Sequence, residues 1–376
     1  MRIEQLELMN FRNYSKLNIK FNDKLNIIIG NNAQGKTNIL EAIYYLSISK
    51  SFLSINDKNV IKHNEMHSFI KGKINYLHKL ENLKISITSN NKKLEVNKVE
   101  IKKHCDFIGK LKVIIYYPDS LRIIKDGPSN RRRFLNIEIS QLYLKYIKLL
   151  NEFNIVLKQR NEYLKVMKSG NINIDYYNII TEKFIKLSVD IYRYRKDFID
   201  NINKYIGDIF IYISGTSGLK LFYDTQIDVS VDNNIKVNLY EKIKSNYDRE
   251  IIYGTSLIGP HRDDFSFKAD NIDLLLYGSQ GQQKMAVLAL KLAEIDVFMD
   301  ICSEYPVLLL DDLFSELDVD KRNKVISYLN RDIQTIVTTT DIDNINDKII
   351  NEAYVFKINN GEVMTDNYKT IEKGTW

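Results

Sequence analysis

The 376-residue sequence predicts an α/β fold, in which a head with a mixed sheet and an antiparallel β subdomain carries a short, inserted antiparallel helical arm. A glycine-rich loop between an apolar strand and a helix lies near the N-terminus. A second buried strand, which ends in two aspartates, lies near the C-terminus. Two long stretches with helical spacing lie between the glycine-rich loop and this strand. We therefore expect a head built from residues 1–127 and 218–376, with the arm at 128–217.

Composition leaves several function classes open. Lysine and arginine number 54 against 48 aspartates and glutamates, and this mild excess of +6 permits a nucleic-acid partner without requiring one. No apolar run approaches the roughly 18 residues of a membrane span, and the charged N-terminus does not resemble a signal peptide. The two cysteines, Cys105 and Cys302, are far apart, which is typical of a reducing compartment. We expect a soluble, cytoplasmic protein that does not contact membranes.

The glycine-rich loop at residues 30–37, GNNAQGKT, matches the phosphate-loop pattern G-x-x-x-x-G-K-[ST] at every fixed position. The β-branched run at 25–29 predicts a strand before it, and the apolar spacing at 39–46 predicts a helix after it. Backbone amides and the helix N-terminus would surround nucleotide phosphates, Lys36 would reach the β- and γ-phosphates, and Thr37 would bind Mg²⁺. The candidate nucleotide-binding residues here are Gly30, Asn31, Asn32, Ala33, Gln34, Gly35, Lys36, Thr37 and Asn38.

The first part of the head is predicted to be rich in strands. Residues 2–8, 17–21 and 25–29 are expected to be strands, with a turn at 11–14. Alternating stretches between 67 and 97 predict an antiparallel β subdomain, and Asn90-Asn91 predicts a hairpin turn within it. The apolar run at 113–117 predicts a further strand.

The arm is predicted from helical periodicity. Apolar residues recur at alternating intervals of four and three between 142 and 156, and again between 184 and 209. The Ser169-Gly170-Asn171 break predicts two long helices that run antiparallel. They are too short for an extended coiled coil.

The C-terminal part supplies candidate catalytic groups. Ser279 is suited to cap a helix that runs to about 299, and VLLLDD at 307–312 predicts a buried parallel strand, with another strand at 333–338. Asp311 would hold Mg²⁺, commonly through water, and Asp312 would orient or deprotonate an attacking water. The alternative for each carboxylate is a helix cap or a solvent-facing position.

The sequence resembles the ATP-binding-cassette ATPases in four segments: 30–37, SQGQQ at 279–283, Asp311-Asp312 and SELD at 315–318. The resemblance implies that Ser279 contacts the γ-phosphate of a nucleotide held by a second protomer, and that 315–318 lies between protomers. It adds Gly281, Gln282 and Asp318 as nucleotide-site candidates and Ser279 as a catalytic one. TTTD at 338–341 stands where that class commonly places a switch histidine, and this departure leaves the γ-phosphate sensor near Thr340 unassigned.

Within this class the sequence resembles the RecF family of bacterial recombination mediators. The resemblance rests on LELMNFRNY at 6–14, GNNAQGKTN at 30–38, YYPDSLRIIKDGPSNRRRFLN at 116–136, GPHRDD at 259–264, SQGQQK at 279–284 and LLLDDLFSELD at 308–318. It also implies that Arg12 and Asn13 form the family's turn near the nucleotide.

The functions that this resemblance implies are ATP-dependent DNA binding and weak, DNA-stimulated ATP hydrolysis. It further implies an ATP-dependent homodimer on duplex DNA near single-strand gaps, and also on single strands, with RecR and RecO as partners. The expected roles are recombinational repair, replication restart and the SOS response, in a nucleoid-associated location. The alternatives are another SMC-like repair ATPase, a transporter ATPase subunit, or an architectural adaptor with incidental ATPase activity.

Arg131, Arg132 and Arg133 follow the predicted start of the arm's first helix. Cations in a first helical turn oppose the helix dipole, so three together suggest a compensating anion. We hypothesise that at least one of the three contacts DNA or a partner. Internal carboxylate partners or solvation would explain the run equally well.

Overall fold

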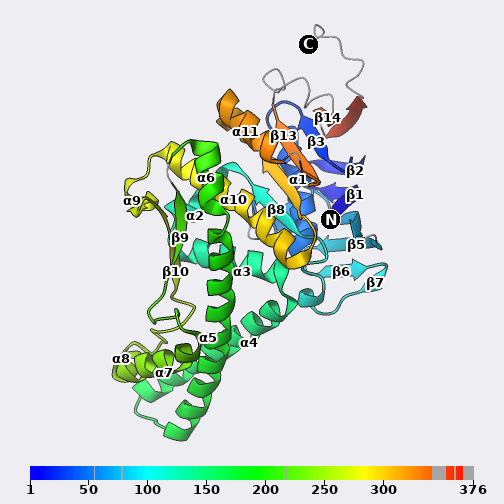
Figure 1. Ribbon diagram of the computed structural model, residues 1–376. Helices are drawn as coiled ribbons and strands as arrows, with labels where there is room; N and C mark the ends of the chain where they lie inside the picture. The colour runs from blue at the N-terminus through cyan, green and yellow to red at the C-terminus, as the bar shows by residue number, and fades with distance from the viewer. Residues whose placement is uncertain are drawn as a thin grey trace. The chain divides into compact units, whose positions relative to one another are not determined.

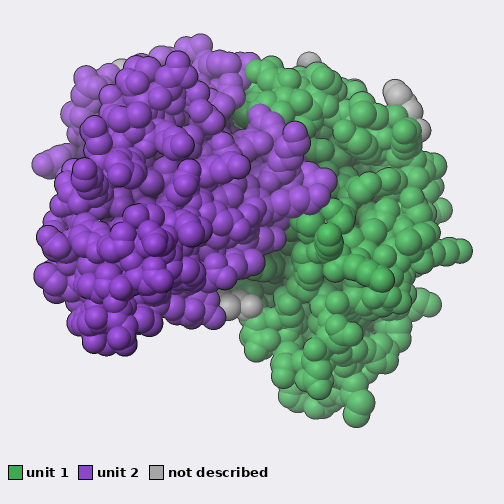
Figure 2. Space-filling model, turned by 90° about the horizontal axis from the view of Figure 1, so that it is seen from below, with its two compact units in different colours: residues 1–120, 212–215, 288–376 green, residues 121–211, 216–287 purple. Residues whose placement is uncertain are grey.

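The computed structural model describes residues 1–54, 56–77, 79–216, 218–329, 331–340, 353–359 and 361–366. The chain forms two compact units, which Figure 2 shows in green and purple. Unit 1 comprises residues 1–120, 212–215 and 288–376, and unit 2 comprises residues 121–211 and 216–287. Each unit has its own sheet structure, and the long helix α10 (Gln280–Cys302) contributes residues to both.

The sheet of unit 1 that carries the phosphate loop has the order β15-β14-β3-β13-β12-β8, and all its neighbours are parallel except β14 and β15. Aliphatic side chains fill these strands because layers cover both faces of a parallel sheet. The carboxyl ends of β3, β13 and β12 meet at one edge, which is where ligands bind in such sheets. The strands are β3 (Leu25–Ile29), β8 (Val113–Tyr116), β12 (Val307–Asp311), β13 (Thr335–Thr339), β14 (Tyr354–Asn359) and β15 (Glu362–Asp366).

The second sheet of unit 1 is the predicted antiparallel β subdomain, with the order β2-β1-β4-β5-β6-β7. Its hairpin at Asn90-Asn91 is confirmed, because Thr88 and Asn91 close the turn between β5 and β6. The sequence did not predict that the first two strands also join this sheet, since β1 pairs with β4 across about sixty intervening residues. The strands are β1 (Arg2–Phe11), β2 (Tyr14–Lys20), β4 (His67–Tyr76), β5 (Lys79–Thr88), β6 (Lys92–Val96) and β7 (Val99–Glu100).

Helix α1 (Lys36–Ile48) follows the phosphate loop and contacts strands of both sheets of unit 1. Side chains are buried on all its sides, as expected of a helix that lies between two layers. Figure 1 shows α1 among the strands of unit 1. Only residues 30–35 lie between the end of β3 and the start of the helix, so this packing holds its N-terminus close to the carboxyl end of that strand. Helix α11 (Val319–Leu329) follows β12, and Asp318 caps it by accepting a bond from the Lys321 amide at 2.9 Å.

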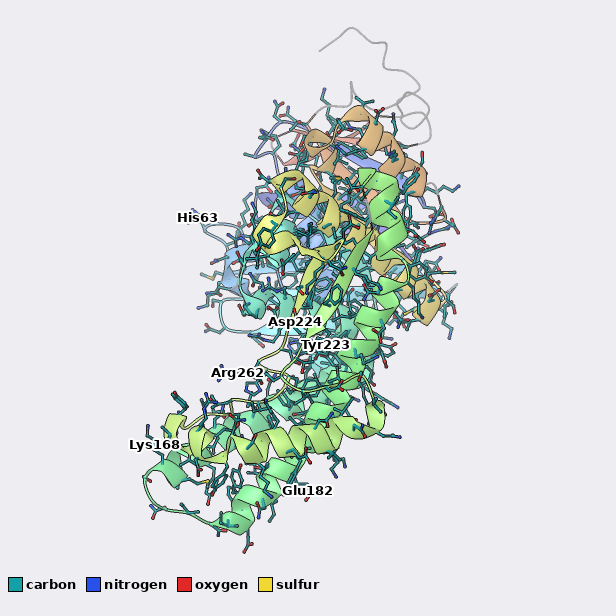
Figure 3. All side chains as sticks on the ribbon, turned by 60° about the vertical axis from the view of Figure 1, so that its left-hand side comes forward. His63, Lys168, Glu182, Tyr223, Asp224 and Arg262 are labelled. Carbon is teal, nitrogen blue, oxygen red and sulfur yellow. The ribbon has the colours of Figure 1, made fainter. Side chains whose placement is uncertain are left out.

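Unit 2 contains the predicted helical arm. Helices α4 (Leu144–Lys168) and α5 (Ile174–Asn203) form the antiparallel pair, and residues 169–173 join them, as expected. Lys168, at the end of α4, and Glu182, on α5, are labelled on this pair in Figure 3. The other elements are α2 (Arg122–Lys125), α3 (Pro128–Leu142), α7 (Ile235–Ser245), α8 (Tyr247–Tyr253), α9 (Leu274–Tyr277), β9 (Leu219–Asp224), β10 (Asp264–Ala269) and β11 (Ile272–Asp273). Helix α6 (Ile206–Ser214) begins in unit 2, and its residues 212–214 belong to unit 1.

Two buried ion pairs connect the arm helices to other parts of unit 2. Arg160 of α4 and Glu250 of α8 are both fully buried and lie 2.7 Å apart. Arg195 of α5 donates to the Pro260 carbonyl at 2.6 Å and pairs with the buried Asp263. A buried charge that loses its partner costs several kcal/mol, so these pairs strongly constrain how the arm packs within unit 2.

The predicted division at residues 127 and 217 stays a prediction. The compact units have bounds of their own, and unit 2 contains residues 216–287 as well as the arm. The continuous helical run expected up to residue 209 is interrupted, because α5 ends at Asn203 and α6 begins at Ile206. In the described part of the chain, no helix is both long and apolar enough to span a membrane.

Candidate nucleotide site

The phosphate loop begins where β3 ends and closes on the N-terminus of α1. Gly35 has φ 108°, a left-handed conformation that disfavours any side chain. A Cβ at this position would lie 2.5 Å from the side-chain nitrogen Nδ2 of Asn13 and 2.8 Å from the Tyr14 hydroxyl. Asn13 donates to the Gln34 carbonyl at 3.0 Å, and Tyr14 donates to the Gly35 carbonyl at 3.1 Å. The turn between β1 and β2 therefore stabilises the loop through hydrogen bonds to two of its carbonyls.

Lys36 lies within this loop. Its ammonium donates to the carbonyls of Gly30 at 2.6 Å and Asn31 at 3.0 Å, and the residue is only 7% exposed. Burial lowers the pKa of the Lys36 ammonium, and the nearby charges of Asp312 and Asp311 partly oppose this shift. A buried cation held by carbonyl dipoles at a helix N-terminus is well placed to bind anionic phosphates.

Thr37 and Asp311 meet across the edge of the sheet. The Thr37 hydroxyl lies 3.0 Å from each oxygen of the Asp311 carboxylate, although 274 residues separate them in sequence. Thr338 lies on β13, the strand between β3 and β12, and its hydroxyl donates to Asp311 Oδ1 at 2.6 Å. Burial raises the pKa of the Asp311 carboxyl, and the bonds from Thr338 and Thr37 oppose that rise. The structure thus places together the two residues expected to hold Mg²⁺.

The donor set at this point fits Mg²⁺. A threonine hydroxyl and a carboxylate are hard oxygen ligands, and Mg²⁺ commonly binds proteins through one or two such groups, with phosphates and waters completing its shell. No cluster of three or more histidine, cysteine, aspartate or glutamate side chains suited to a metal occurs among the described residues. A metal bound here would therefore depend on the nucleotide as well as on Thr37 and Asp311.

Asp312 directly follows β12 and adopts a left-handed conformation with φ 51°. Its amide donates to the Thr338 carbonyl at 3.2 Å and to the Thr338 hydroxyl at 3.0 Å. Its carboxylate oxygen Oδ1 is buried and has no hydrogen-bond partner within the described parts of the chain. A buried, unsatisfied acceptor beside the phosphate loop is the chemistry required to orient a water molecule.

Arg12 and Asn13 occupy different positions relative to the loop. Asn13 contacts it directly and also accepts a bond from the Asn38 amide at 2.8 Å. The Arg12 guanidinium instead pairs with both oxygens of Glu41 on α1, at 2.8 and 2.5 Å, and donates to the Asn59 carbonyl. Glu41 is fully buried and also accepts a bond from the Ser51 hydroxyl. That Arg12 touches nucleotide stays a prediction.

The SQGQQ segment at 279–283 belongs to unit 2, where Ser279 caps α10 as predicted. The Gln282 amide donates to the Ser279 hydroxyl at 3.2 Å, and the Gln282 side chain accepts from the Ser279 amide at 2.9 Å. This reciprocal capping box fixes the start of the helix. Ser279, Gly281 and Gln282 are all exposed. Asp318, the candidate in the 315–318 segment of unit 1, is exposed too and pairs with Lys321 at 2.5 Å.

The three consecutive arginines have different environments. Arg131 is 5% exposed and makes a bidentate pair with Asp264 at 2.5 and 2.9 Å. Arg132 donates to the Asp263 carbonyl at 2.7 Å. Arg133 is exposed. The internal-partner alternative accounts for Arg131 and Arg132, so the hypothesis of a DNA or partner contact now rests mainly on Arg133.

Comparisons with known proteins identify the family of the chain. The family model described as the RecF/RecN/SMC N terminal domain matches residues 2–363. A DNA replication and repair protein RecF of Bacillus cereus (strain AH820) is 39% identical over 96% of this chain and 98% of its own length. The RecF protein of Ligilactobacillus salivarius (strain UCC118) is 36% identical over 99% of this chain and its full length. The chain belongs to the RecF family.

Solved structures agree with this assignment. The recombination mediator protein RecF of the RecFOR pathway, solved with ATP, has a TM-score of 0.88, 30% identity, and coverage of 96% of this chain and 97% of its own. An Smc head domain with an extended coiled coil has a TM-score of 0.57 at 15% identity, which shows a shared fold only. The predicted ATPase head with mixed and antiparallel sheets is confirmed, and the chain is an ATPase of the ABC/SMC-like class.

Some residues of this RecF-family site were not predicted. Glu41 sits among apolar residues of α1, and a carboxylate in so apolar a helix was a signal that sequence reasoning could have used. Tyr14 gave no comparable signal, because its contact with Gly35 depends on strand pairing. Thr338 was noted only as part of a possible switch segment, and Asp341 of that segment lies outside the described residues.

Proposed function

We propose that this RecF-family chain is an ATP-dependent DNA-binding protein of recombinational repair and replication restart. The observation that carries the proposal is the meeting of Lys36, Thr37 and Asp311 at one edge of the parallel sheet. RecF relatives that match almost the whole chain, among them one solved with ATP, support the same nucleotide.

Each residue of the site would have a separate task. The loop amides and Lys36 would bind the triphosphate, and Thr37 with Asp311 would hold Mg²⁺, which would supply positive charge to the site. Asp312 accepts a hydrogen bond from the attacking water and can take up its proton. An aspartate side chain is shorter than the glutamate common in related ATPases and holds this water less well, so turnover is slow.

A second copy of the chain would complete the site. Ser279, Gly281 and Gln282 present a helix N-terminus to solvent, and such an end binds anions. The adjacent apolar residues of α9 are also exposed, with Leu276 at 69% and Tyr277 at 76%. Exposed apolar residues next to an anion-binding helix end suit a contact with another protein surface. We therefore propose an ATP-dependent homodimer, with Asp318 of the 315–318 segment between protomers.

The dimer would close on DNA, with RecR and RecO as further partners, and the protein would be cytoplasmic and nucleoid-associated. Duplex DNA near single-strand gaps is the proposed substrate, with single strands as a second one. The net charge of +6 is compatible with phosphate contacts, and the exposed Arg133 is a candidate for one of them.

Hydrolysis measurements with and without DNA test the proposed function. ATP turnover by the wild-type chain is compared without DNA and with gapped duplex, intact duplex or single strands, at fixed salt. Size-exclusion chromatography with ATP or ADP reports assembly. The proposal predicts DNA-stimulated hydrolysis and dimers that depend on ATP. A monomer whose slow hydrolysis ignores DNA would favour an architectural adaptor instead.

Ser279→Arg is expected to retain ATP binding but to lose ATP-dependent dimerisation. Arginine at this position places bulk and charge on the exposed helix start, while the phosphate loop of the same chain stays intact. The measurement pairs fluorescent-nucleotide titration with light scattering. Ser245→Arg, at an exposed serine at the end of α7 in the same unit, is the matched control and should dimerise normally. Normal dimerisation of Ser279→Arg would refute the proposal that Ser279 of one copy completes the nucleotide site of another.

A further inference from the structure

Thr338 links the two carboxylate residues of the candidate site. It lies on β13 directly opposite Asp311 of β12 in the parallel register, and it is completely buried. Its hydroxyl donates to Asp311 Oδ1 at 2.6 Å and accepts a bond from the Asp312 amide at 3.0 Å. One side chain thus contacts the residue expected to hold Mg²⁺ and the residue expected to orient water.

The bond to Asp311 determines how that carboxylate is presented. The Thr37 hydroxyl approaches both oxygens equally, at 3.0 Å, and therefore does not select one carboxylate rotamer. The Thr338 hydroxyl approaches Oδ1 alone, from a strand that the sheet holds on both sides. Hydrogen bonds to a charged acceptor contribute more than neutral ones, so this bond is well suited to fix the orientation of Asp311.

The bond to Asp312 stabilises an uncommon backbone conformation. Non-glycine residues in the left-handed region cost of order 1–3 kcal/mol unless their surroundings hold them. The Asp312 amide is shared between the hydroxyl and the carbonyl of Thr338, so a single residue holds this turn from two atoms. The turn brings the Asp312 side chain to the same edge of the sheet as Asp311.

Thr335 shows that a buried threonine on this strand need not use its hydroxyl. It is three residues earlier on β13 and only 2% exposed, and its hydroxyl has no hydrogen-bond partner among the residues the structure describes. A β-branched side chain suits a strand whether or not it carries a hydroxyl, so packing alone would accept valine at both positions. The two threonines differ in what their hydroxyls contact.

We propose that Thr338 is a positioning residue for ATP hydrolysis, which aligns Asp311 and Asp312 together and acts through them rather than on the nucleotide. The inference rests on the proposed ATPase function. It implies that removing the hydroxyl impairs catalysis and the use of Mg²⁺ while the affinity for the nucleotide itself is retained, because within the described residues no hydrogen bond joins Lys36 or the loop amides to Thr338.

The test compares Thr338→Val, Thr338→Ser and Thr335→Val with the wild-type chain. The measurements are kcat and KM for ATP, the Mg²⁺ concentration at half-maximal activity, and nucleotide affinity in EDTA by fluorescence titration. Thr338→Val should lower kcat about ten- to a hundredfold, the range of one hydrogen bond to a charged group. It should also raise the Mg²⁺ requirement and leave affinity in EDTA within about twofold, a free-energy difference well under 1 kcal/mol.

Two comparisons make the result specific to the hydroxyl. Thr338→Ser keeps the hydroxyl and should recover most of the lost kcat, whereas Thr335→Val should match the wild-type chain in every measurement. Equal losses in Thr338→Val and Thr335→Val, or no recovery in Thr338→Ser, would overturn the inference and leave the proposed function standing. A wild-type chain without any ATP hydrolysis would overturn the proposed function, and this inference with it.

Discussion

Lys36→Ala is expected to weaken ATP binding by about 2–5 kcal/mol, which is at least roughly 30-fold in Kd, because it removes the buried cation of the phosphate loop. The ammonium is held by the carbonyls of Gly30 and Asn31, so it is already placed where phosphates would bind. Isothermal titration with a slowly hydrolysed ATP analogue measures the loss directly.

The control for Lys36→Ala is Lys24→Ala. Lys24 is exposed and lies before the first residue of β3, whereas the phosphate loop follows the last residue of that strand. Lys24→Ala therefore removes the same charge from the same unit without changing the site. Lys24→Ala should bind nucleotide like the wild-type chain. Thermal unfolding of Lys36→Ala should stay close to that of the wild-type chain, since truncating a buried lysine also removes its desolvation cost. An unchanged Kd for Lys36→Ala would contradict the assignment of the loop.

Asp312→Asn is expected to bind ATP normally and to remain in the ATP-bound, dimeric state, with single-turnover hydrolysis slowed by roughly 10²- to 10⁴-fold, the range for loss of a general base. Asparagine matches aspartate in size and tolerates the left-handed conformation at this position better than most residues. The fold of the site should therefore survive, and only the acceptor for the water proton is lost.

Chromatography after a chase with ADP measures the dimer lifetime of Asp312→Asn. Asp320→Asn, an exposed carboxylate in the first turn of α11, removes an equal charge from the same unit and should dissociate like the wild-type chain. If Asp312→Asn dimers separate at the wild-type rate while ATP is still hydrolysed, Asp312 does not deprotonate the attacking water.

The elements around the site that the sequence predicted and the structure contains are those encoded in one local stretch. Residues 25–37 and 307–312 each combine an apolar strand with the polar residues that directly follow it, so each pattern can be recognised without knowledge of the rest of the fold. The sequence also predicted the two long arm helices, because their apolar spacing extends over many turns.

The parts that the sequence did not predict depend on which distant segments become neighbours. Strand order places β13 between β3 and β12, and only that order brings Thr338 beside Asp311. Likewise, Tyr14 reaches Gly35 only because β1 and β2 turn back toward the loop. Helix α7 was missed because its buried residues, Ile235, Leu239 and Ile243, form a short stripe in a polar segment.

A mixing experiment with two inactive variants tests most directly the claim that two copies of the chain form each site. Lys36→Ala lacks a working phosphate loop but keeps Ser279, whereas Ser279→Arg keeps the loop but lacks the Ser279 side chain. A mixed dimer of the two would contain one site with both halves intact. The account predicts that the mixture hydrolyses ATP well above the sum of the separate variants. A mixture no more active than that sum would contradict it.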